Sequence, residues 1–323
     1  MQIQKRYVLL AAAALALPPL ASAQTSSKPL RIVSSFSPGG PVDFVARTLA
    51  EQLGRELKRP VIVENKPGAN GALGAMETLR SEADGSTLWI TSVGAAAINP
   101  TLVPKLPYNT LRDFAPVSLV ANNVEVLVVN AKDPVSDAAN FINAVKAGKD
   151  STPMASSGSG SIPHLALIQL EESTGARFLH IPYKGMAPAF TDLMGGQVKG
   201  VFADVPAIMA QVQGGRLKAI GIAASKRHPS LPEVKTFEEQ GIKAVDTNNW
   251  YALFASAKTQ AAVVEQLNKA VRAAIADPEV HARLLKGGAE PKSSTPQELA
   301  ALLKADTDKW ATLIKTRNIK AEE

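Results

Sequence analysis

The feature that most constrains the fold is an alternation of short apolar runs with segments patterned as amphipathic helices. Residues 30–34 form an apolar run of strand length, and residues 42–57 then place apolar side chains three and four positions apart, as one face of a helix does. Pro60 ends this helix before a second apolar run at residues 61–63. Repeated βαβ units of this kind predict parallel sheets with helices on both faces.

The alternation continues as two cycles along the chain. The first cycle adds a helix over residues 72–83 and a strand over residues 88–92. The second cycle is expected to contain strands over residues 124–129, near Met154 and over 178–181, 198–202 and 217–223, with helices over 137–147 and 161–174. Helical patterns then follow over residues 261–276, 279–286 and 297–316. These last helices form either a domain of their own or a cover for the earlier sheet, to which a strand over residues 250–255 would return the chain.

The composition indicates a folded protein of about two domains. The 323 residues are 46% hydrophobic and 20% charged and include no cysteine, a balance that excludes disordered, fibrous and disulfide-stapled chains. The formal net charge is +6, but the basic residues are scattered rather than gathered in runs. That distribution argues against a nucleic-acid-binding surface.

The first 23 residues are predicted to be a secretory signal peptide. Lys5 and Arg6 precede an uninterrupted apolar run over residues 7–17, which is shorter than the roughly 20 residues that span a membrane. Ala21 and Ala23 have the spacing of a cleavage site, so we expect cleavage after Ala23. Because no cysteine can carry a lipid, the mature protein is expected to be free in the exported compartment.

Two glycine-rich loops stand out, each between a predicted strand and a predicted helix. The first covers residues 35–41 and contains Gly39 and Gly40; the second covers residues 156–161 and combines serines with Gly158 and Gly160. Glycines expose backbone N–H groups and a helix start adds unpaired donors, so each loop can hold an anion without a charged side chain or simply form a β-to-α turn. Two such loops facing each other would form a clamp for an oxygen-rich ligand.

Other chemistry finds little support in the sequence. The second loop lacks the Gly-Lys-Ser/Thr of a Walker loop, the third glycine of a dinucleotide fingerprint and the Gly-x-Ser-x-Gly of a hydrolase elbow. The four histidines are isolated from one another, so we expect no metal site, and nothing indicates a cofactor. No catalytic residue is predicted.

The order of the motifs resembles the Bug/TctC family of periplasmic substrate-binding receptors for tripartite tricarboxylate transporters. The resemblance covers nearly the whole mature chain. The matching segments are 32–43, 63–71, 99–100, 106–108, 113–118, 155–164, 180–185, 195–198 and 250–251.

This resemblance implies a type II Venus flytrap in which two α/β domains are joined by crossing strands. The first domain would be discontinuous, comprising residues 24–123 and 249–323, and the second would comprise residues 124–248. Family members usually bind small organic acids, holding a carboxylate through backbone groups and ordered waters between the two loops. The resemblance also implies large and small integral-membrane transporter subunits as partners, a periplasmic location and a monomeric receptor.

The expected ligand-binding residues fall into three groups. The first loop contributes Phe36, Ser37, Gly39, Gly40 and Asp43, and the second contributes Ser157, Gly158, Ser159, Gly160, Ser161 and His164. Ser92, Lys184 and Asp204 complete the set. Asp43 either contacts the ligand or caps the first helical turn, Ser92 either donates into the pocket or ends its strand, and Lys184 either lines the cleft or shapes a turn.

Asp204 marks a departure from the family. Many members read Phe-Asp-Asn where this chain reads Phe202-Ala203-Asp204. Facing the ligand, Asp204 would repel a second carboxylate and favour an amine or hydroxyl. Since adjacent residues at a strand end point to opposite sides, we expect it instead to face solvent.

The sequence thus predicts a receptor that makes and breaks no bond. It would capture a small carboxylated metabolite and present it to a membrane permease, closing when ligand contacts to both lobes stabilise the closed form. A sensory receptor of the same architecture feeding a histidine kinase is the alternative. An exported serine hydrolase using a hydroxyl of residues 156–161 is a third hypothesis.

Overall fold

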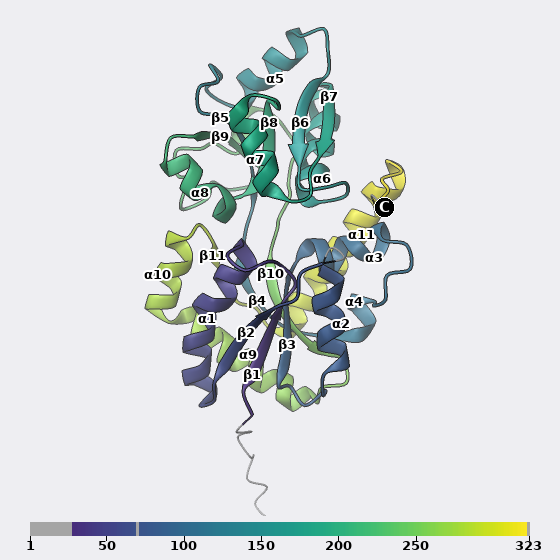
Figure 1. Ribbon diagram of the computed structural model, residues 1–323, viewed down its shortest axis with the longest axis vertical. Coiled ribbons are helices and arrows are strands. Elements are labelled where there is room, and N and C mark those ends of the chain that lie inside the picture. The colour runs from purple at the N-terminus through teal and green to yellow at the C-terminus, as the bar shows by residue number, and fades with distance from the viewer. Residues whose placement is uncertain (1–27, 69–70, 322–323) are drawn as a thin grey trace, which may run out of the picture.

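The computed structural model describes residues 28–68 and 71–321, which fold into two lobes, each built on its own β-sheet (Figure 1). The predicted signal peptide lies outside the described residues. None of the helices in those two stretches is both long and apolar enough to cross a membrane.

The first lobe combines strands from both ends of the chain. Its strands are β1 (Leu30–Ser34), β2 (Val61–Asn65), β3 (Thr87–Ser92), β4 (Phe114–Asn122), β10 (Tyr251–Ser256) and β11 (Glu290–Pro291). They form a sheet of order β11-β4-β10-β3-β1-β2. β1 pairs in parallel with β2 and β3, whereas β10 runs antiparallel between β3 and β4.

Helices cover both faces of this first sheet. They are α1 (Pro41–Leu57), α2 (Ala72–Arg80), the π-helix η2 (Gly94–Ile98), α3 (Asn99–Leu102), α4 (Thr110–Asp113), α9 (Ala261–Ala276), α10 (Pro278–Lys286) and α11 (Pro296–Thr316). Alternate residues of β3 enter different cores: Leu88 packs in a cluster with Val271 of α9, and Trp89 in a cluster with Trp310 of α11. The C-terminal helices therefore complete the first lobe, as one of the two sequence interpretations proposed.

The second lobe repeats the α/β pattern. Its strands are β5 (Glu125–Asn130), β6 (Thr152–Ser156), β7 (Phe178–Pro182), β8 (Gly200–Asp204) and β9 (Leu217–Ile222). Its helices are α5 (Ala138–Ala147), α6 (Ile162–Thr174), α7 (Met186–Gly195), α8 (Val205–Gln213) and the short η3 (Glu238–Gln240). The strand order is β7-β6-β8-β5-β9, with β6 parallel to β7 and β8 and with β5 antiparallel to β8 and β9.

Two paired segments cross between the lobes. One connects β4 to β5, and the other precedes β10; Asn123 and Asn249 exchange backbone hydrogen bonds of 3.1 and 2.8 Å. Val124 forms an isolated bridge with Asn248 beside them. The lobes are therefore joined by short, hydrogen-bonded crossing strands that can act as a hinge.

The lobes also touch on both sides of these crossing segments. Near α6 and α11, Arg317 forms an ion pair with Glu172, and on the other side Ser230 Oγ donates to the carbonyl of Leu285 over 3.0 Å (Figure 1). Leu102 of α3 approaches Gly160 so closely that an added Cβ would stand 2.2 Å from its Cδ2. The first lobe thus closely contacts the glycine-rich loop of the second.

Several elements were not predicted from the sequence, among them the helices α7 and α8 and the strands β4 and β11. β4 was not predicted, because Pro116 and Ser118 dilute its apolar pattern; it pairs with β10 through two register shifts. The strand expected over residues 198–202 is β8, which begins at Gly200 and includes Asp204 as its last residue.

Candidate ligand-binding site

In each lobe, the strand order predicts one crevice, at the point where the connections that follow two neighbouring parallel strands run toward opposite sides of the sheet. In the first lobe the adjacent strands are β1 and β3: the chain leaves β1 through α1 toward β2, but leaves β3 toward β4 on the other side. Ligands of α/β sheets bind at the carboxyl ends of strands at such switch points. This crevice is bordered by the loop of residues 35–40 and by Ser92.

The second lobe has the same arrangement between β6 and β8. From β6 the chain passes through α6 to β7, whereas from β8 it passes through α8 to β9 on the far side of β5. The loop of residues 157–161 follows β6, and Asp204 ends β8. The glycine-rich loop and Asp204 therefore border one crevice, on neighbouring strands.

The strand directions place these two crevices on the edges of the two sheets that adjoin each other. β4 runs parallel to β3, because both are antiparallel to β10, so the chain leaves the first lobe at the carboxyl edge of β1 and β3. It enters the second lobe at Glu125, which pairs with Asp204 at the carboxyl end of β8. A hydrogen bond from the Tyr251 hydroxyl of the first lobe to the Asp204 carboxylate joins the two edges. The two glycine-rich loops therefore lie at the edges of the two sheets that meet between the lobes, and we call the region between these edges the interlobe cleft.

The first loop is held by Asp43, at the start of α1. One carboxylate oxygen accepts the Gly39 N–H at 2.9 Å and Arg47 Nε at 2.9 Å, and the other accepts Asn65 Nδ2 at 2.7 Å. Burial would raise the pKa of Asp43, but these three donors outweigh it and lower the pKa below its usual value. Asn65 also donates to the Phe36 carbonyl at 3.0 Å. Asp43 therefore ties the first loop to the start of α1 and to β2.

The second loop is held by glycine conformations and by His164. Gly158 and Gly160 have φ values of +128° and +75°, which favour glycine. Ser161 Oγ donates to the Gly158 carbonyl at 2.7 Å, and the Gly160 N–H donates to His164 Nδ1 at 2.9 Å. Ser161 also caps α6. Both side chains thus shape the loop.

His164 is neutral in this arrangement. Its ring stacks on His180 with centroids 3.8 Å apart, and burial followed by the neighbouring His180 ring lowers its pKa to about 3. Because Nδ1 accepts a hydrogen bond, the ring proton lies on Nε2. Ser156 Oγ lies 2.6 Å from His180 Nε2, but Ser156 is fully buried and has no access to a substrate.

The remaining predicted residues occupy different places around the cleft. Phe36 and Gly40 are half-buried and Ser37 is exposed at the first loop, while Ser157 and Ser159 are half-buried at the second. Ser92 ends β3 directly opposite Tyr251. Lys184 is exposed in the turn after β7, one strand beyond β6. The backbone of Tyr183, the residue before Lys184, contacts the second loop: a Cβ added at Gly158 would stand 3.6 Å from the Tyr183 carbonyl oxygen.

The expectation that Asp204 faces solvent is wrong. Its carboxylate accepts the hydroxyl proton of Tyr251 from the other lobe, because β8 extends to Asp204 and places its side chain at the interlobe edge. Glu125, Asn249 and the role of Tyr251 were not predicted from the sequence. A signal existed at Glu125, since a carboxylate at the start of an otherwise apolar strand needs a specific partner.

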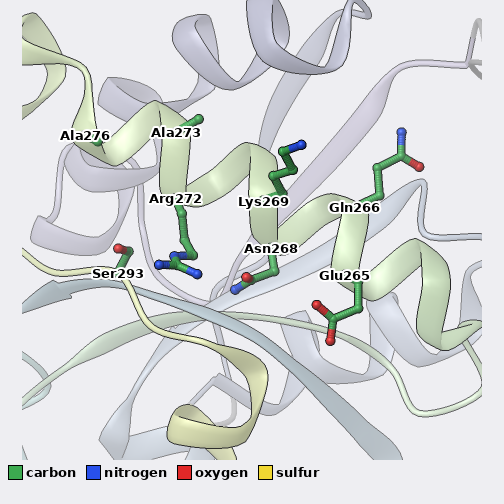
Figure 2. A pocket seen from close by; sticks show the side chains of 8 residues that line it. All are labelled: Glu265, Gln266, Asn268, Lys269, Arg272, Ala273, Ala276 and Ser293. Carbon is green, nitrogen blue, oxygen red and sulfur yellow. The ribbon is translucent and has the colours of Figure 1, made fainter.

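An open groove lies elsewhere, along the exposed face of α9. It has a volume of about 760 Å³ and is lined by Ala273, Ala276 and six polar or charged residues, among them Glu265, Lys269 and Arg272 (Figure 2). It is formed by one helix and Ser293, and no residue of the two glycine-rich loops lines it. The interlobe cleft, where both loops converge, is the better candidate site.

Comparison with known proteins identifies the family. The sequence profile of the tripartite tricarboxylate transporter family receptor, TctC, matches residues 45–319. The chain belongs to this family. Protein BugT of Bordetella pertussis, a curated relative, is 33% identical over 315 residues, which cover 97% of this chain and 96% of BugT.

Solved structures of TctC and Bug relatives share the two-lobed fold. The periplasmic binding protein BugD is 32% identical with a TM-score of 0.80, covering 91% of this chain and 99% of BugD. MatC from Rhodopseudomonas palustris with bound malate is 30% identical with a TM-score of 0.77, covering 88% and 98% of the two chains. An R. palustris protein with adipate is 28% identical with a TM-score of 0.83, covering 90% and 97%. These likenesses confirm the Venus flytrap architecture and a family of periplasmic solute-binding receptors, which are not enzymes.

Proposed function

We propose that this receptor captures a small carboxylated metabolite in the interlobe cleft and delivers it to a tripartite tricarboxylate-type membrane transporter. The observation that carries the proposal is the pair of glycine-rich loops facing one cleft at the two switch points. Each loop opens into a helix N-terminus, that of α1 or α6, where the helix dipole favours an anion. Malate and adipate in the two solved relatives agree with this ligand class.

The recognition is expected to rest on backbone amides rather than on cationic side chains. His164 is neutral, and Arg47 already pairs with Asp43. A carboxylate bound by amides of both lobes stabilises the closed arrangement, because only closure lets it contact both loops. Closure by ligand would then provide the signal for docking to the permease.

The proposed organisation follows from the same arrangement. We place the first lobe at residues 24–123 and 249–323 and the second at residues 124–248, which agrees with the membership of the strands in the two sheets. The mature receptor would begin at Gln24 after signal cleavage and act in the periplasm, as its family does. N-terminal sequencing of the exported protein tests the cleavage site.

A thermal-shift screen of the mature protein tests ligand capture. The panel comprises malate, adipate, other mono-, di- and tricarboxylates, amino acids and aromatic acids. Free ligand at 100 times Kd adds about 2.7 kcal/mol to stability, which is readily detected. A shift confined to carboxylates, with the added compound recovered unchanged, supports the proposal, whereas turnover of the compound or binding confined to uncharged compounds would overturn it.

Delivery requires a separate experiment. Uptake of the radiolabelled carboxylate that binds is measured in cells that contain the transporter subunits, with and without the receptor gene. We expect uptake to require the receptor. Unchanged uptake, together with ligand-dependent activation of a histidine kinase, would favour the sensory alternative.

A further inference from the structure

Two carboxyl groups stand side by side at the edge of the second lobe that faces the cleft. Glu125 and Asp204 are directly paired in the antiparallel register of β5 and β8, so their Cβ atoms are about 4.5–5.5 Å apart on one face of the sheet. Glu125 is 1% exposed, whereas Asp204 is half-buried. The pair therefore has an inner carboxyl group and an outer one that borders the crevice.

This cluster contains more hydrogen-bond acceptors than donors. The Tyr251 hydroxyl donates to Asp204, and Asn249 Nδ2 donates to Glu125 Oε1 at 3.2 Å. Glu125 Oε2 and Asn249 Oδ1 are buried with no hydrogen-bond partner among the described residues. Both side-chain donors are neutral, so neither compensates the charge of the carboxyl pair. A buried acceptor oxygen without a partner is stabilised when a proton is added to the carboxyl group or when a ligand donates a hydrogen bond to it.

The outer carboxyl group is the better place for a negative charge. Asp204 is the N-cap residue of α8 and receives the Tyr251 hydroxyl. A helix N-terminus favours an anion. Glu125 has only the Asn249 amide; burial and then the Asp204 charge raise its pKa, and burial raises that of Asp204 as well. The geometry therefore puts the shared proton on Glu125 and leaves a carboxylate at Asp204.

Asp204 lies on the crevice opposite the second loop. It ends β8, and the loop of residues 157–161 follows the adjacent parallel strand β6. Neighbouring strands are about 4.8 Å apart. Tyr251, which holds the Asp204 carboxylate, is paired with Ser92 at the edge of the first-lobe crevice. A ligand anchored by its carboxylate on the glycine-rich loops thus presents its other polar end near Asp204.

We propose that Asp204 is a specificity-determining residue that selects carboxylates whose second polar group is a hydrogen-bond donor, an ammonium above a hydroxyl, and discriminates against a second carboxylate. The inference rests on the proposed carboxylate-binding function. A ligand ammonium both pairs with the Asp204 charge and supplies a donor that the cluster lacks. A second carboxylate would instead meet a like charge in a partly desolvated cleft.

The test uses matched probes that differ only in one end group. Calorimetry measures binding of dicarboxylates, ω-amino carboxylates and ω-hydroxy carboxylates with four, five and six carbons to the mature protein. We expect the best amino carboxylate to bind about ten- to a hundred-fold more tightly than the dicarboxylate of equal length, the range of a charge-assisted hydrogen bond. Asp204→Asn should reduce that ratio by at least about tenfold.

Three controls separate selection from damage to the fold. Asn is also a good helix N-cap and accepts the Tyr251 hydroxyl, so Asp204→Asn should fold, which thermal unfolding verifies. Tyr251→Phe keeps the Asp204 charge and should keep the preference for the ammonium. Asp308→Asn removes one negative charge on the exposed face of α11 and should leave the ratio unchanged.

The outcomes distinguish this inference from the proposed function. Dicarboxylates that bind as tightly as the amino carboxylates at every length, or an unchanged ratio in Asp204→Asn, would overturn the role of Asp204 while leaving a carboxylate receptor. Binding by none of the probes, with a shift in the thermal screen only from compounds without a carboxylate, would overturn both.

Discussion

Gly160→Ala tests whether contact between the lobes controls affinity. Gly160 has φ +75°, and a Cβ there would stand 2.2 Å from Leu102 Cδ2 and 2.8 Å from Cδ1, across the interlobe boundary. Two penalties follow. Backbone strain of about 1–2 kcal/mol acts within the second lobe in every state. The clash with Leu102, about 1–3 kcal/mol for overpacking, acts only when the lobes are together.

Only the second penalty changes ligand affinity. A cost of about 1–3 kcal/mol that is confined to the closed form weakens binding roughly 5- to 150-fold. The matched control is Gly175→Ala at the other end of α6: its φ is +67°, and nothing lies within 4 Å of an added Cβ. This variant should lose about the same backbone stability and keep the affinity of the wild type.

Calorimetry with whichever carboxylate binds most tightly measures the affinities, and urea unfolding measures the stabilities. A second measurement needs no ligand: because the chain has no cysteine, Asn143→Cys on α5 and Gln266→Cys on α9 can be spin-labelled specifically. Gly160→Ala should shift the distance distribution between the labels, and Gly175→Ala should not. Equal affinities within twofold and superimposable distance distributions for the two variants would refute the reasoning.

Three further predictions concern the side chains that support the site. Asp43→Ala should lower the free energy of unfolding by about 1–3 kcal/mol in urea at pH 7. Because the pKa of Asp43 is lowered in the folded protein, this contribution is present above about pH 4 and is lost as acid protonates the carboxylate. An unchanged urea midpoint at pH 7 would contradict the role of Asp43. Because the pKa of Glu125 is raised, the folded protein keeps a proton that the unfolded chain releases above about pH 4. The stability of the wild type should therefore fall as the pH rises, and Glu125→Gln should be more stable than the wild type at pH 8 by about 1–3 kcal/mol. A Glu125→Gln variant less stable than the wild type at pH 8 would count against the buried carboxyl pair. His164 has a pKa of about 3, so its ring should show no NMR titration between about pH 5 and 8. Its contribution to stability should decline as the pH falls below about 6.5, the pKa of histidine in the unfolded chain. A titration midpoint above about pH 5 would rule out the neutral ring.

The local pattern of apolar residues was sufficient to predict helices and strands whose buried positions repeat regularly along the chain. The apolar spacing of α1 and the run of β1 predicted both elements, because each buries one face or both faces in a regular way. The positions of the two glycine-rich loops could then be predicted, since each loop joins a predicted strand to a predicted helix. The helix N-caps and positive φ angles that shape these loops depend on residues close together in the sequence, so they can be predicted from it.

Contacts between distant residues were decided by the tertiary structure. β4 lacks a clear apolar alternation and is a strand because β10, more than a hundred residues later, pairs with it. In the same way, the contact between Asp43 and the first loop depends on Asn65 of the neighbouring strand, which shares the Asp43 carboxylate.

The chain by itself determined the α/β class, the two loops, the family resemblance and the residues available for an anion site. The tertiary structure decided that Asp204 turns toward Tyr251 of the other lobe, that Glu125 stands beside it and that Leu102 presses on Gly160. The reason is physical: periodic burial is encoded within a few residues, whereas the charge balance of a cleft depends on groups that the strand order brings together from remote parts of the chain.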